Sequence, residues 1–358
     1  MFGSAWNRTS RVSGSGFRLL STQFSTSGGQ VVGRALITGV TGQDGQHLSA
    51  LLLEKGYTVF GLVRNPDSVR AHNFTLEFPE VQLLQGDMSD TKSLIRCLQL
   101  SKPDEIYNLA AQSLVSLSYK QPEATANVTG LGPLRLLEAV RITGFEHSRV
   151  YQASSSEMFG RTQEVPQVET TPFDPISPYG TAKVFAHNTC VNLREAYGLW
   201  VSCGILFNHE GPRRGLDFVT RKISSGAARI ALGLQDTITL GSLDSRRDWG
   251  YAGDYVNAMW LMLQQDVPRD FVVATGISHS VKEFVCAALK SAGLDEDIEK
   301  FVRSDPSLVR PSEGGHLIGD SSLASRELGW RTTMTFDNLV CAMVEHDLRI
   351  AFAETRGE

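Results

Sequence analysis

Residues 34–63, RALITGVTGQDGQHLSALLLEKGYTVFGLV, decide the fold of this 358-residue chain. A short apolar run is followed by a turn with three glycines, by leucines at helical spacing and by a second apolar run. Strand, glycine turn, helix and strand form the first unit of a dinucleotide-binding fold. Glycines let the backbone approach a pyrophosphate, and a helix N-terminus offers it free N–H groups. The spacing is G-x-x-G-x-x-G rather than G-x-G-x-x-G. The prediction therefore depends on the position of this glycine turn between a strand and a helix.

The same alternation continues along the chain. Apolar runs predict further strands at 81–87, 104–113, 149–155 and 200–208, and amphipathic spacing predicts helices at 133–144 and 177–198. Strands that alternate with helices indicate an α/β protein with a Rossmann-type, doubly wound parallel sheet.

The residue that selects the dinucleotide is expected about 20 positions after the glycine turn, at the end of the second strand. An acid there binds the ribose hydroxyls of NAD, whereas an arginine accommodates the additional phosphate of NADP. The residue here is Arg64, and no acid occurs in GLVRN (61–65). The sequence therefore favours NADP, with an ordinary surface arginine as the alternative.

Composition excludes several classes of function. The net charge is −5, so no basic face favours a nucleic acid. No run of 18 or more apolar residues is present, so no membrane span is expected. The five cysteines are scattered without metal-ligand or redox spacing, which predicts reduced, mostly buried thiols and no metal site.

The first 33 residues have a composition of their own. They contain Arg8, Arg11 and Arg18 and many serines, and the first acid of the chain is Asp44. An arginine- and serine-rich leader without acids is typical of an organellar transit peptide, which predicts a mitochondrial location. The alternative is a disordered Ser/Gly tail on a cytoplasmic protein. Either way, residues 1–33 are set apart from the fold.

Four residues are candidates for catalysis. Tyr179 and Lys183 are four apart in a predicted helix and so share one face. An ammonium beside the tyrosine is expected to lower its pKa and make it a base toward an alcohol. Ser155 ends a predicted strand at the edge where ligands bind in such sheets. Hydride transfer needs these three groups but not Glu157, which is either a further acid–base residue or a solvated loop acid.

Several stretches carry a family resemblance: ALITGVTGQDG, YNLAAQS, YQASSSEMFG, SPYGTAK, GILFNHEGPRRGLDFVTRKI, LGSLDSRRDWGYAGDYV and ATGISHSVKEF. With them the chain resembles the extended short-chain dehydrogenase/reductases and, among these, the GDP-mannose 4,6-dehydratase family. The resemblance implies an NADP-binding Rossmann domain (mainly 34–210) and a smaller C-terminal nucleotide-sugar-binding domain (mainly 211–358), with some segments returning to the sheet. It also implies GDP-mannose as substrate, tightly held NADP and a homodimer or homotetramer.

The resemblance assigns site residues as well. The catalytic residues it implies are Ser155, Glu157, Tyr179 and Lys183. The implied cofactor contacts are Gly39, Thr41, Gly42, Gln43, Asp44, Gly45, Arg64, Asp87, Met88, Leu109, Ala110, Ala111, Ser113, Lys183, His209 and Arg214. The implied substrate contacts are Asn208, Lys222, Arg247, Arg310 and Glu313. For each charged member, a surface charge or a structural ion pair is the alternative.

The reaction so implied gives Glu157 a task. Tyr179 takes the proton from the sugar O4 as C4 is oxidised, Glu157 removes the acidified C5 proton and helps the C6 hydroxyl leave as water, and hydride returns to C6. The product is GDP-4-keto-6-deoxymannose, on the route to GDP-fucose or other GDP-deoxyhexoses. Two other functions stay open: a reductase or epimerase of the same fold acting at C4, and a non-catalytic NADP-binding organellar protein.

The sequence departs from the family pattern in places. Ser155 stands for a threonine, Asn65 for the second residue of an arginine pair, Leu114 for a histidine, Ile176 for an arginine and Gly314 for an aspartate. The segment 65–80 holds only one arginine, where many members have an arginine-rich loop that supports a tetramer. A dimer is therefore at least as strongly expected as a tetramer.

Overall fold

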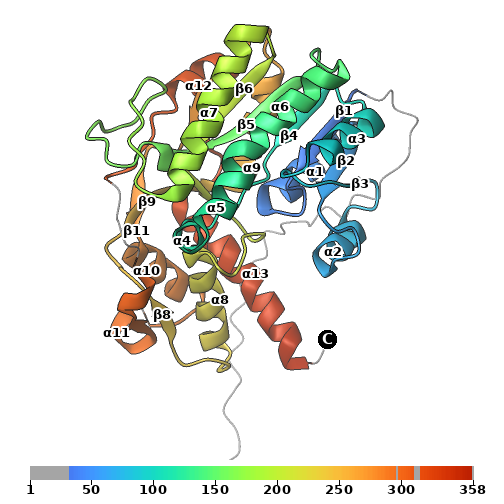
Figure 1. Ribbon diagram of the computed structural model, residues 1–358. Helices are drawn as coiled ribbons and strands as arrows, with labels where there is room; N and C mark the ends of the chain where they lie inside the picture. The colour runs from blue at the N-terminus through green and yellow to red at the C-terminus, as the bar shows by residue number, and fades with distance from the viewer. Residues whose placement is uncertain (1–31, 296, 310–314, 357–358) are drawn as a thin grey trace, which may run out of the picture. The chain divides into compact units, whose positions relative to one another are not determined.

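A seven-stranded parallel sheet organises the residues that the computed structural model describes, which are 32–295, 297–309 and 315–356 (Figure 1). The strand order is β10-β6-β5-β4-β1-β2-β3. The strands are β1 (Arg34–Thr38), β2 (Thr58–Val63), β3 (Gln82–Gln85), β4 (Glu105–Asn108), β5 (Arg149–Ser155), β6 (Val201–Leu206) and β10 (Phe271–Val273). The order 3-2-1-4-5-6 is that of a Rossmann sheet, so the predicted fold class is confirmed.

Helices cover both faces of this sheet. Two buried apolar clusters form there, one with side chains of α1, α9 and α12 and the other with side chains of α3, α6 and α7. The helices are α1 (Gln43–Glu54), α3 (Thr91–Ser101), α6 (Leu131–Thr143), α7 (Pro178–Tyr197), α9 (Ala252–Leu263) and α12 (Ser322–Leu328). Short helical turns α4 (Val115–Lys120), α5 (Pro122–Thr125) and η1 (Ala126–Gly130) lead from β4 into α6, and η2 (Ser156–Met158) follows β5.

A third apolar cluster joins elements from the later part of the chain. It packs α8, α10 and α13 against two small sheets of order β11-β9-β7 and β12-β8. These elements are β7 (Asn208–Glu210), α8 (Val219–Ala231), β8 (Ile238–Leu240), β9 (Arg246–Tyr251), β11 (Ser278–Ser280), α10 (Val281–Ser291), α11 (Ile298–Phe301), β12 (Val302–Ser304), η3 (Pro306–Leu308) and α13 (Phe336–Arg356). The division near residue 210 stays a prediction; β10, α9 and α12 follow that residue yet pack with the large sheet.

One segment differs from its expectation. Residues 65–80, for which the sequence indicated no element, contain helix α2 (Val69–Glu77). The Ser68 hydroxyl caps the helix by accepting the N–H of Ala71, and Phe74 is buried against Phe78, with the ring centroids 4.9 Å apart. Only one turn of apolar residues faces inward, which is too short a pattern to show in the sequence.

Three further observations concern the described residues alone. None of their helices is both long and apolar enough to cross a membrane. No group of three or more His, Cys, Asp or Glu side chains among them could hold a metal ion. The predicted leader, apart from residues 32 and 33, lies outside them, and so do Arg310, Glu313 and Gly314.

Candidate active site

The glycine turn after β1 has no room for side chains. Gly39 has a φ of +69°, and a Cβ on it would lie 2.9 Å from the backbone nitrogen of Ala110. A Cβ on Gly45 would lie 2.3 Å from the carbonyl oxygen of Val40, so only glycine lets α1 approach β1 this closely. Gly42 caps α1 without a side-chain hydrogen bond, which leaves N–H groups of the first turn for a ligand. This turn therefore fits a dinucleotide pyrophosphate.

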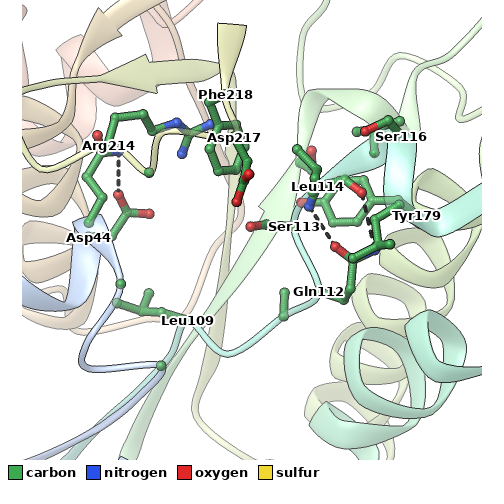
Figure 2. A pocket seen from close by; sticks show the side chains of 18 of the residues that line it. Asp44, Leu109, Gln112, Ser113, Leu114, Ser116, Tyr179, Arg214, Asp217 and Phe218 are labelled. Carbon is green, nitrogen blue, oxygen red and sulfur yellow. Dashed lines mark hydrogen bonds between the residues drawn. The ribbon is translucent and has the colours of Figure 1, made fainter. Parts of the chain in front are cut away.

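One cavity of about 1850 Å³ lies beside the turn, and it is lined by every predicted site residue that the structure describes. Its wall includes the carboxyl ends of β1, β4 and β5, where the strand order reverses between β1 and β4. In Figure 2, Asp44, Leu109 and Arg214 lie on one side of the space, and Gln112, Leu114 and Tyr179 lie across from them. The volume is larger than that of a typical single-ligand pocket and is suited to two ligands at once.

The end of β5 and the start of α7 bring the four predicted catalytic residues together. The Ser155 hydroxyl accepts the N–H of Glu157 at 3.2 Å and lies beside the Tyr179 phenol, whose pKa it acts to lower. A Cβ on Gly180 would lie 2.6 Å from the carbonyl oxygen of Glu157, so the start of α7 packs directly on this backbone. Tyr179 is 8% exposed and Glu157 is half-buried. A phenol and a carboxyl group, both able to exchange protons, therefore line the same wall.

Burial sets the ionisation of the tyrosine and the lysine. Burial raises the pKa of Tyr179 to about 12 and outweighs the lowering effect of Ser155. Burial also lowers the pKa of Lys183 to about 8. The Lys183 ammonium donates to the carbonyl of Ala153 at 2.6 Å, and its nitrogen lies 5.7 Å from the centre of the Tyr179 ring. The net shift of the Tyr179 pKa is therefore upward, opposite to the lowering expected from the lysine alone.

A partly buried ion pair joins the glycine turn to β7. The His209 ring contacts the Phe207 carbonyl through Nδ1 at 2.8 Å and the Asp44 carboxylate through Nε2 at 2.9 Å. Both partners only accept hydrogen bonds, so the ring carries two protons and a positive charge. Burial opposes this charge, but Asp44 holds the pKa of His209 above its usual value. Although burial acts to raise the pKa of Asp44, His209 keeps it well below its usual range. Asp44 thus stands beside the pyrophosphate turn with its charge balanced.

Two adjacent arginines, Arg213 and Arg214, follow β7, and only the second was predicted to line the site. The Arg214 guanidinium stacks over the Phe218 ring at 3.5 Å, and its Nε lies 2.9 Å from Glu210 in an ion pair. Arg213 binds Gln46 at 2.6 Å and both oxygens of Glu77, which ties this loop to α1 and α2. Hydrogen bonding by Arg213 lowers the pKa of Glu77. Arg213 could have been found from the sequence PRRG (212–215), because it is the neighbour of Arg214, which was already predicted to line the site.

The predicted substrate contacts that the structure describes line the cavity as well. Asn208, Lys222 and Arg247 line it together with the apolar side chains of Leu240 and Trp249. Of the positions that depart from the family pattern, Asn65 and Leu114 also line the cavity. The carbonyl of Ile176 accepts the Tyr119 hydroxyl at 3.1 Å, so this position acts through its backbone.

Comparison with known proteins identifies the family. A family model described as GDP-mannose 4,6 dehydratase matches residues 36–343. The chain is 48% identical over 351 residues to GDP-mannose 4,6-dehydratase of Yersinia enterocolitica, covering 89% of this chain and 94% of that protein. It is 50% identical over 333 residues to GDP-mannose 4,6 dehydratase 1 of Arabidopsis thaliana (89% and 91%) and 47% identical over 340 residues to the Homo sapiens enzyme (88% and 91%).

Solved structures agree on the fold. Thermus thermophilus UDP-glucose 4-epimerase, in complex with NAD, matches with a TM-score of 0.77 and 27% identity over 88% of this chain and 98% of that one. The Pseudomonas aeruginosa protein RMD, in complex with NADPH, matches with a TM-score of 0.73 and 23% identity, over 88% of this chain and 99% of that one. From the extent and identity of the sequence matches, the chain belongs to the GDP-mannose 4,6-dehydratase family.

Proposed function

We propose that this protein is a lyase that converts GDP-mannose to GDP-4-keto-6-deoxymannose with a nicotinamide cofactor that ends the cycle unchanged. The product serves the synthesis of GDP-fucose or another GDP-deoxyhexose. The observation that carries the proposal is the position of Glu157: it is half-buried and lines the same cavity as Ser155, Tyr179 and Lys183. A C4 reductase or epimerase needs no such acid.

Each catalytic residue has a proposed task. When bound, the oxidised nicotinamide supplies the hydride acceptor and later donor and brings a positive charge that favours the phenolate. Tyr179 takes the proton from O4, and Ser155 holds the same oxygen through its hydroxyl. Lys183, anchored on the carbonyl of Ala153, places its ammonium on the tyrosine side of the site. Glu157 removes the C5 proton and passes it to the C6 hydroxyl, which leaves as water. As hydride returns to C6, Tyr179 gives the O4 proton that it holds to C5.

A direct assay tests this function. The protein is incubated with GDP-mannose and NADP, and the products are analysed by mass and, for the configuration at C4, by NMR. A product lighter by one water is expected. A product of unchanged mass with inverted C4 indicates an epimerase, and NADP binding without any product indicates a non-catalytic protein.

We propose NADP rather than NAD as the cofactor, on the basis of Arg64. This exposed residue follows β2 and lines the cavity. Arg64→Asp is expected to weaken NADP binding by about 1.5–3 kcal/mol, the value of a charge-assisted hydrogen bond, and to leave NAD binding nearly unchanged. Both dissociation constants can be measured by titration calorimetry. An equal loss for the two dinucleotides excludes a phosphate contact by Arg64.

Assembly and location remain predictions of the same proposal. We expect a homodimer or a homotetramer, which sedimentation of the purified protein distinguishes. The composition of residues 1–30 predicts mitochondrial import, and a reporter fused to this segment would enter mitochondria. A reporter that stays in the cytoplasm would leave the alternative of a plain tail.

A further inference from the structure

A buried arginine lies directly behind the cofactor-facing loop. Arg221, on α8, is 8% exposed, and its partner Asp347, on α13, is 3% exposed. The Arg221 Nε lies 2.8 Å and 3.0 Å from the two carboxylate oxygens, and its Nη2 lies 2.7 Å from one of them. The Ser224 hydroxyl donates to the same carboxylate at 2.6 Å. The charge pair is therefore fully enclosed and well oriented.

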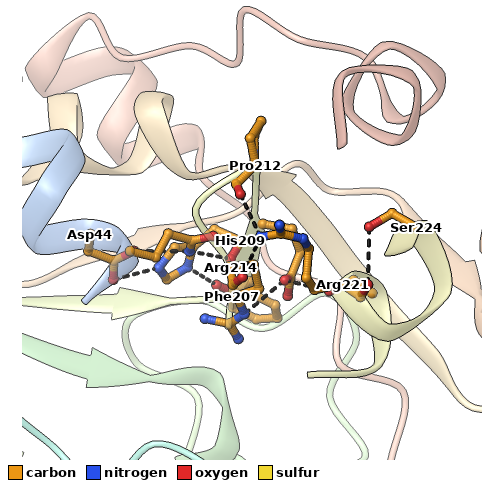
Figure 3. Close-up of polar contacts among 10 residues, drawn as sticks. Asp44, Phe207, His209, Pro212, Arg214, Arg221 and Ser224 are labelled. Carbon is orange, nitrogen blue, oxygen red and sulfur yellow. Dashed lines mark hydrogen bonds and ion pairs between the residues drawn. The ribbon is translucent and has the colours of Figure 1, made fainter. Parts of the chain in front are cut away.

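The third nitrogen of the guanidinium, Nη1, binds the loop that follows β7. Arg221 Nη1 donates to the carbonyl of Pro212 at 2.6 Å and to the carbonyl of Arg214 at 2.8 Å (Figure 3). The planar guanidinium thus binds two carbonyl groups of the loop, one on each side of Arg213. The neighbouring Thr220 reaches the same loop through Glu210, to which it donates at 2.7 Å. The first turn of α8 consequently fixes both the backbone of the loop and the carboxylate that pairs with Arg214.

Apolar packing also holds α8 against α13. Apolar side chains of both helices already pack in one buried cluster, which includes Ile223 and Ala227 from α8 and Val340 and Val344 from α13. A buried ion pair is often replaceable by apolar residues without loss of stability. The two bonds to the loop carbonyls are what an apolar side chain cannot supply.

We propose that Arg221, oriented by Asp347 and Ser224, is a positioning residue that sets the loop 211–218 and thereby the Arg214 guanidinium for binding the dinucleotide. The inference rests on the proposed cofactor site, in which Arg214 is a contact. Loss of the carbonyl bonds lets the Arg214 backbone shift. The effect is therefore expected to be larger on cofactor affinity than on affinity for the sugar nucleotide.

Two variants separate positioning from stability. In Arg221→Met/Ser224→Ala/Asp347→Leu, apolar groups replace the charged cluster, so Tm is expected to stay close to that of the unmodified protein. Arg221→Lys keeps a positive charge near Asp347, but one ammonium cannot bind a carboxylate and two carbonyls in the same planar arrangement. Both variants are expected to raise the Kd for NADPH about tenfold, which corresponds to the loss of one to two hydrogen bonds.

The measurements are fluorescence titration with NADPH, the KM for GDP-mannose at saturating NADP, and thermal unfolding. Arg229→Gln is the matched control, because Arg229 pairs with Glu354 between the same two helices but at the surface. That control is expected to change none of the three quantities. If the triple variant keeps both the Tm and the NADPH affinity of the unmodified protein, the Arg221–Asp347 ion pair does not position the loop and the proposal is wrong.

If the triple variant does not fold, the Arg221→Lys variant tests the proposal by itself. Normal NADPH affinity in the Arg221→Lys variant also overturns the proposal. A separate outcome concerns the activity. An unmodified protein that binds NADPH but does not dehydrate GDP-mannose contradicts the proposed function and leaves the NADPH comparison intact.

Discussion

Tyr179→Phe is expected to abolish the reduction of NADP by GDP-mannose and to lower product formation by about 10²–10⁴-fold. The substitution removes one oxygen, the phenol oxygen that would receive the O4 proton. The ring remains, and Ser155 can still accept the N–H of Glu157, so the wall of the cavity keeps its shape. Single-turnover absorbance of NADPH and the mass of the product measure the loss.

Tyr197→Phe is the matched control for this prediction. It removes the same oxygen from the same helix, at a ring that is 56% exposed and far along α7 from the cavity. We expect it to reduce NADP and release product normally. Reduction of NADP by Tyr179→Phe at the unmodified rate would show that another group takes the O4 proton.

Local patterns predicted the sheet and the cofactor turn because both depend on short stretches of sequence. Three glycines between an apolar strand and a leucine-rich helix leave few alternatives, and the close approach of Gly45 to Val40 shows why. The same holds for Tyr179 and Lys183, whose spacing on one helix places them on one face. Helix α2 was not predicted, because Phe74 is the only large side chain on its buried face.

Contacts between distant residues could not be predicted in the same way. Asp44 and His209 are 165 residues apart, and Arg221 and Asp347 are 126 apart. Nothing local to any of these four residues indicates its partner. The raised pKa of Tyr179 has the same origin, because the packing of the whole site excludes water from the phenol and no spacing rule reports it.

Glu157→Gln is expected to separate oxidation at C4 from loss of water. Glutamine keeps the size and the backbone contact of this residue with Ser155 but cannot accept the C5 proton. Tyr179, Lys183 and the glycine turn are unchanged, so NADP should still be reduced. Elimination should slow by about 10²–10⁴-fold, since that is the usual contribution of general acid–base catalysis.

The two catalytic variants must therefore fail differently. With Glu157→Gln, NADPH should accumulate, little product should form, and exchange of the C5 proton with deuterated water should fall. With Tyr179→Phe, NADPH should not appear at all. Glu164→Gln, which changes an exposed acid in the following loop, should behave like the unmodified protein. If Glu157→Gln releases product at nearly the normal rate, the C5 base is a different group, because a half-buried acid on this wall would then contribute nothing that an amide cannot.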